Sequence, residues 1–96
     1  MDNKQNNLQV MVNLFIDQWR AYAHNPALSN APVTYMHLND RKYYINRIRN
    51  LMDVEERMKT ATGSEQRILN QKRIVIRKDF EDLYRKCNNL PREQAY

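Results

Sequence analysis

The sequence has little of several residues on which common functional sites depend: one glycine, one cysteine, two histidines and three prolines. A single glycine excludes the glycine-rich loops that hold phosphates in P-loop and dinucleotide-binding proteins. A single cysteine excludes an intramolecular disulfide framework, and with two histidines it offers none of the usual zinc-ligand spacings. Because glycine and proline punctuate secondary structure, their scarcity leaves room for long helices.

Long apolar runs are missing as well. No segment approaches the roughly 20 apolar residues of a membrane span. The polar start, M-D-N-K-Q-N-N, lacks the order of basic, apolar and small residues that marks a secretory signal. Together with the lone cysteine, this predicts an intracellular, cytoplasmic protein that does not engage a membrane. The net charge of +5, from 16 basic and 11 acidic residues, is a mild excess that permits a polyanionic partner.

Apolar residues recur at spacings of three and four in three segments, which predicts three amphipathic helices. The first should end before Asn25-Pro26, since proline disfavours helix in the residue before it. Gly63 suits the left-handed residue that closes the second helix. The expected bounds are 5–24, 40–60 and 64–88 for the helices, 25–39 for an ordered crossover and 89–96 for a short tail.

Segment 73–78, R-I-V-I-R-K, raises a choice between strand and helix because β-branched residues favour strands. Leu69, Ile76 and Leu83 around it recur at intervals of seven, which indicates a helical stripe. We therefore predict one all-α domain over residues 1–96, a small three-helix bundle. The second and third helices form a long antiparallel hairpin, and the N-terminal amphipathic helix packs across it.

The first predicted helix has more apolar surface than one face of a small bundle uses. Val10, Leu14 and Ile16 fall outside its main seam, so either the crossover or another chain should cover this second side of the helix. Ile74 likewise falls on the face opposite the core stripe of the third helix, where it is either an ordinary exposed residue or a partner contact. The leading hypothesis is a non-enzymatic adaptor or oligomerising subunit. Its predicted protein interface is Val10, Leu14, Phe15, Ile16, Trp19 and Ile74.

Basic residues of the second and third helices support an alternative function, the binding of nucleic acid as an accessory protein. The antiparallel hairpin should bring the two groups side by side. Against this, acidic residues are interleaved with them, whereas a strong phosphate-binding face would be uniformly basic. The candidate residues are Arg41, Lys42, Arg47, Arg77 and Lys78.

We predict that the acidic residues form structural ion pairs and do not form a catalytic site. The expected register of the hairpin brings Glu55 near Arg73, so we predict an ion pair between them. Cys87 falls on the apolar stripe of its helix, which favours a buried thiol over a nucleophile. We therefore expect no catalytic residue, no cofactor, no metal and no small-molecule substrate. The size fits a small accessory protein of a phage or virus.

Overall fold

The computed structural model of the chain describes residues 3–27, 30–33 and 36–88. Within these residues the chain forms three helices, α1 (Asn3–His24), α2 (Leu38–Met58) and α3 (Gly63–Cys87), and no strand. The prediction of an all-α three-helix bundle is confirmed, with helix bounds within two residues of those expected. The predicted tail, 89–96, lies outside the described residues, as do 28–29 and 34–35 of the crossover.

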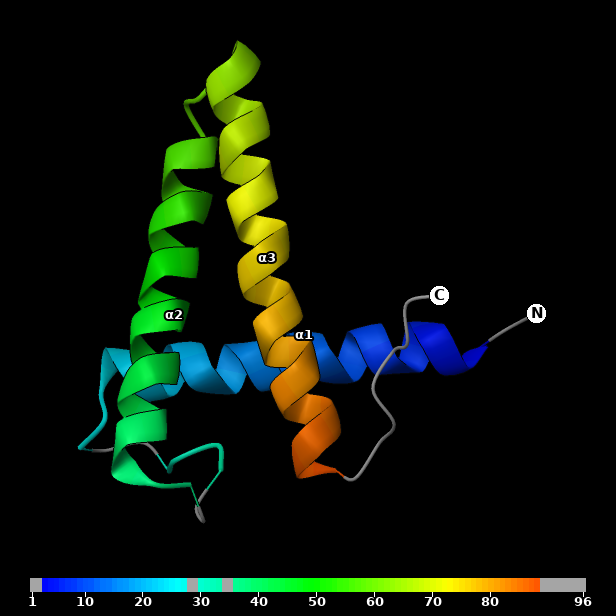
Figure 1. The fold of residues 1–96 in the computed structure, drawn as a ribbon, viewed down its shortest axis with the longest axis vertical. Helices are drawn as coiled ribbons and strands as arrows, with labels where there is room; N and C mark the ends of the chain where they lie inside the picture. The colour runs from blue at the N-terminus through cyan, green and yellow to red at the C-terminus, as the bar shows by residue number, and fades with distance from the viewer. Residues whose placement is uncertain (1–2, 28–29, 34–35, 89–96) are drawn as a thin grey trace.

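The three helices form two layers. α2 and α3 lie side by side as an antiparallel hairpin, and α1 runs across both of them, nearer the open end of the hairpin than its tip (Figure 1). The N-terminal turns of α1 extend past α3 (Figure 1). Because α1 crosses the hairpin instead of running along it, one face of α1 covers parts of both helices.

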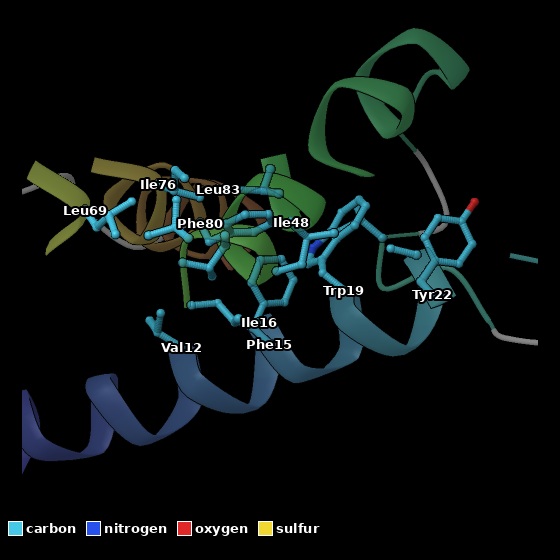
Figure 2. Packing of buried hydrophobic residues seen from close by; sticks show 14 residues of the cluster. Val12, Phe15, Ile16, Trp19, Tyr22, Ile48, Leu69, Ile76, Phe80 and Leu83 are labelled. Carbon is cyan, nitrogen blue, oxygen red and sulfur yellow. The ribbon is translucent and has the colours of Figure 1, made fainter. Parts of the chain in front are cut away.

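The core lies between these two layers, with Trp19 at its centre. Trp19 is fully buried, and its ring lies 5.7 Å from that of Tyr44 and 6.0 Å from that of Phe80, measured between centroids. Phe15 and Tyr22 of α1 flank it with edge-on contacts. The core residues of α1 project toward Ile48, Ile76 and Phe80 of the hairpin (Figure 2). Burial of large aromatic rings in offset or edge-on geometry supplies much of the cohesion of so small a domain.

The connection between α2 and α3 is short. Backbone N–H groups of Thr60 and Ala61 donate to the carbonyl of Arg57 at 3.2 and 3.1 Å, which closes the end of α2. Gly63 has a φ of +62°, the left-handed conformation that L-residues with a side chain rarely adopt. A Cβ at this position would meet no atom within 4 Å. The backbone conformation, rather than any lack of space, therefore favours glycine here.

The described part of the crossover packs on the core. Val33 is buried, and Ala31 and Met36 lie against the core cluster. This packing explains why segment 25–39 carries apolar residues, but it leaves Val10 and Leu14 of α1 exposed.

Candidate functional site

α1 has a second apolar face that does not pack in the core. Val10, Met11 and Leu14 are 55%, 45% and 52% exposed. At about 100° per residue, Val10 and Leu14 point away from the core side of the helix. Three further exposed residues surround them. The outer face of α1 consists of Asn7, Val10, Met11, Leu14, Gln18 and Ala21.

None of these six side chains is charged, but Asp17 borders the face, three positions after Leu14 and four before Ala21; its side chain is 69% exposed and pairs with Arg20 at 3.4 Å. Between residues 5 and 24, the only acidic or basic side chains apart from His24 are Asp17 and Arg20, and Arg20 is turned toward Glu55 of α2. Charged residues are far more frequent along α2 and α3. Depletion of charge around large apolar side chains is the feature that distinguishes the centres of protein interfaces from other surface.

The residues predicted for a protein interface divide into two groups. Val10, Leu14 and Ile74 are exposed, as an interface requires. The structure corrects the placement of the other three. Because α1 crosses both α2 and α3, a broad face of α1 is in contact with the hairpin. Residues on both sides of the apolar seam of α1 are therefore buried. The buried residues of the predicted interface are Phe15, Ile16 and Trp19.

The predicted ion pair between Glu55 and Arg73 is replaced by a pair between Glu55 and Arg20. Arg20 Nη1 lies 2.5 Å from Glu55 Oε1, and Arg20 Nη2 lies 3.0 Å from Oε2. These hydrogen bonds lower the pKa of Glu55, and they raise the pKa of Arg20. The prediction missed this pair because it considered only the hairpin register, whereas α1 brings its own guanidinium to Glu55.

Arg73 instead contacts a neutral partner on its own helix. Its Nε and Nη2 atoms donate to Asn70 Oδ1 at 3.2 and 2.9 Å. Arg73 still acts on Glu55 at longer range, where its charge helps to lower the pKa of that carboxyl.

The basic residues predicted for nucleic-acid binding do not share one face. Arg47 lines a groove between α2 and α3, where its Nη2 atom pairs with Asp79 Oδ2 at 2.5 Å. Arg77 faces the other layer and donates to Asn13 Oδ1 of α1. Arg41 and Lys42 lie near the start of α2, where Arg41 is half-buried and Lys42 is exposed.

A small cavity lies where α1 meets α3, which we call the α1–α3 seam. Its volume is about 220 Å³, and Arg73, Arg77 and Lys78 of α3 contribute its positive charge. Glu81 is the acidic residue that lines it, and Glu81 accepts hydrogen bonds from Lys78, Arg85 and, across the seam, Gln9. Ile74 also lines this cavity. Gln9 and Asn13 could not be recognised from sequence, because their role depends on where α1 crosses α3.

Groups capable of nucleophilic chemistry meet at one cavity of the described chain, whose lining includes Asp40. Cys87 is half-buried and packs against the core cluster, while His37 is exposed. Both residues line this wide cavity at the open end of the hairpin, together with Tyr44, whose pKa is raised chiefly by burial. Over residues 3–27, 30–33 and 36–88, no group of three or more His, Cys, Asp or Glu side chains could hold a metal ion.

The search for membrane spans finds no helix of the described chain with the length and apolar character to cross a bilayer. Comparison of the chain with models of protein families, with curated proteins and with solved structures finds no match.

Proposed function

We propose that the protein is a non-enzymatic helical interaction subunit that docks on another protein through the outer face of α1. The observation that carries this proposal is the uncharged outer face, on which Val10, Met11 and Leu14 stand about half exposed. A large apolar group on this face loses unfavourable contact with water when it is covered. Asp17 is the one charged group of residues 7–21 that borders the face, and it already has a partner in Arg20, so covering the apolar side chains desolvates little charge.

The shape of the face favours a partner with an apolar groove over a second copy of this chain. The face from Asn7 to Ala21 is one helix wide and about 21 Å long at 1.5 Å per residue. Two such faces pressed flat together would bury roughly 500 Å² in all, well below the roughly 1,000 Å² expected of a specific interface. A groove that wraps the flanks of the helix covers more of it, as in known helix-in-groove complexes.

The two larger grooves of the described chain both carry charged side chains. The cavity at the open end of the hairpin is lined by Asp40 and Lys86 besides its apolar residues. The groove between α2 and α3 is lined by Arg47, Asp53 and Lys72 among others. An uncharged helix face laid over these side chains would desolvate them without supplying partners. A heterologous partner with an apolar groove is therefore the occupant that fits.

Two measurements test this proposal. The first is the molar mass of the purified protein by light scattering at moderate salt, for which we expect a monomer. A dimer that dissociates on Leu14→Glu substitution would show that a second copy covers the face, and it would overturn the heterologous partner.

The second measurement places a photo-reactive amino acid at position 14, with position 71 as the control because Gln71 is exposed on α3 outside the outer face. A protein that crosslinks from position 14 and not from position 71 is then purified and titrated. We expect Leu14→Glu to weaken its binding at least tenfold, and Gln71→Glu to leave it within twofold. Equal binding by the Leu14→Glu variant would show that the outer face of α1 is not the interface.

A further inference from the structure

Two guanidinium groups at the α1–α3 seam are held by neutral partners. Arg73 donates to the amide oxygen of Asn70, and Arg77 donates to that of Asn13. Both arginines are half-buried. Glu55 is within electrostatic reach of both, but its two carboxylate oxygens already accept hydrogen bonds from Arg20. Among the described residues, no carboxylate pairs directly with Arg73 or Arg77, so hydrogen bonds to neutral amides position their positive charge without neutralising it.

The cavity that these arginines line is electropositive. Lys78 lines it as well, and against these three cations it has the single carboxylate of Glu81. That carboxylate is shared, because Lys78 and Arg85 both pair with it at 3.4 Å. Glu81 is well shielded from solvent, with 14% of its side chain exposed. Charges in such a partly buried position interact more strongly than they would in open water, so an entering anion would be held there.

The donor arrangement suits a phosphate group. An arginine has five N–H donors in a planar fork that matches the spacing of phosphate oxygens. The hydrogen bonds to Asn70 and Asn13 orient the two forks and leave further donors on each. Orientation by neutral amides reduces the conformational freedom lost on binding, which favours affinity.

The surroundings of the cavity indicate a polymer of phosphates. Arg67 lies one heptad before Ile74 on the same side of α3, and Arg85 lies beyond Lys78 toward the other end. From Arg67 to Arg85 the basic stripe extends about 27 Å along the helix. Among the described residues, no aromatic side chain lines the cavity, so base stacking has no platform there. Contacts to backbone phosphates, which carry no sequence information, need none.

We propose that the α1–α3 seam is a binding site for the phosphate backbone of a nucleic acid, with Arg73 and Arg77 as its principal donors. This site differs from the basic group suggested by sequence. It contains Arg77 and Lys78 of that group, adds Arg73, and excludes Arg47, which is neutralised by Asp79. It also lies apart from the uncharged outer face of α1, so both surfaces can be occupied independently.

The experiment is a fluorescence-anisotropy titration of the full chain with a labelled single-stranded DNA of about 12 nucleotides, a length within the usual single-domain range. Titrations at several salt concentrations give the slope of log affinity against log salt. We expect Arg73→Gln and Arg77→Gln each to weaken binding several-fold and to reduce the magnitude of the slope by about 0.7, the value for one lost phosphate contact on a single strand. Glutamine removes the charge and keeps an amide N–H donor at the position of the arginine Nε, and circular dichroism verifies the fold of each variant.

Two matched variants make the outcome decisive. Lys72 is an exposed cation of α3 in the groove between α2 and α3, so Lys72→Gln should bind within twofold of the unsubstituted protein. Glu81→Gln removes the carboxylate from the cavity and should tighten binding, a gain that misfolding cannot produce. Unchanged binding by both arginine variants, or an equal loss in Lys72→Gln, would mean that any affinity is diffuse and would overturn the site. Binding of inorganic phosphate without binding of the oligonucleotide would overturn the nucleic-acid ligand.

Discussion

The replacement of Glu55 by glutamine tests the link between α1 and the hairpin. Glu55 and Arg20 have 31% and 30% of their side chains exposed and are joined by two hydrogen bonds, at 2.5 and 3.0 Å. A fully exposed pair contributes about 0.2–1 kcal/mol, and loss of one partner from a buried pair costs about 3–5 kcal/mol. With about a third of each side chain in water, we expect Glu55→Gln to lower the free energy of unfolding by about 1–2 kcal/mol at pH 7.

This loss should depend on pH. The pKa of Glu55 is lowered in the folded state, mainly by the hydrogen bond from Arg20. A carboxyl whose pKa is lowered in the folded state contributes its full stability at pH values above its unfolded pKa, for which 4.5 is the reference value. This contribution is lost as the pH falls through the folded pKa. The difference between the unsubstituted protein and Glu55→Gln should therefore shrink as the pH is lowered through the acidic range.

Urea unfolding followed by the fluorescence of Trp19, the only tryptophan, measures both effects. A double-mutant cycle with Arg20→Gln assigns the coupling to this pair, and a parallel cycle with Arg73→Gln is the control. We expect a coupling free energy of about 1 kcal/mol for the first pair and less than about 0.5 kcal/mol for the second. A larger coupling to Arg73, or a stability difference that does not change with pH, would refute the assignment of Arg20 as the partner.

Two further predictions concern the core and the hairpin turn. Trp19→Ala should lower the free energy of unfolding by about 3–5 kcal/mol because Trp19 fills the centre of the core. Leu14→Ala, on the exposed outer face, should change it by less than about 0.5 kcal/mol. Urea unfolding followed by circular dichroism measures both variants, and similar losses would contradict the burial pattern. Gly63→Ala should lower the free energy of unfolding by about 1–2 kcal/mol, because alanine disfavours the left-handed φ of this position. A stability equal to that of the unsubstituted protein in the same assay would show that the turn has relaxed to another conformation.

The two proposed surfaces have opposite physical character, which makes them separable in experiment. The outer face of α1 is uncharged, so binding there should respond weakly to salt. The α1–α3 seam is cationic, so binding there should weaken steeply with salt through release of counterions. Leu14→Glu should therefore affect only the first interaction, and Arg77→Gln only the second.

Local sequence determined the three helices and their breaks. Residues that contact within a helix are three or four positions apart, so a periodic apolar stripe can be recognised without knowledge of the rest of the fold. Asn25-Pro26 acts on the backbone directly after α1, which is why the end of α1 at His24 was predicted correctly. Gly63 was expected to close α2, but α2 ends at Met58, and the left-handed Gly63 is the first residue of α3. A helical wheel placed Val10, Leu14 and Ile16 outside the seam of α1, but it could not tell that the first two would stay exposed and Ile16 would be buried.

Only the tertiary structure decided which residues meet between helices. The crossing of α1 over the hairpin depends on how side-chain ridges of one helix fit the grooves of two others, which is a property of all three helices at once. That crossing brings Arg20 to Glu55 and Asn13 to Arg77. It also buries Ile16 with Phe15 and Trp19. The charges of the chain could be read from its sequence, but whether each charge is neutralised follows from contacts between residues far apart in the chain.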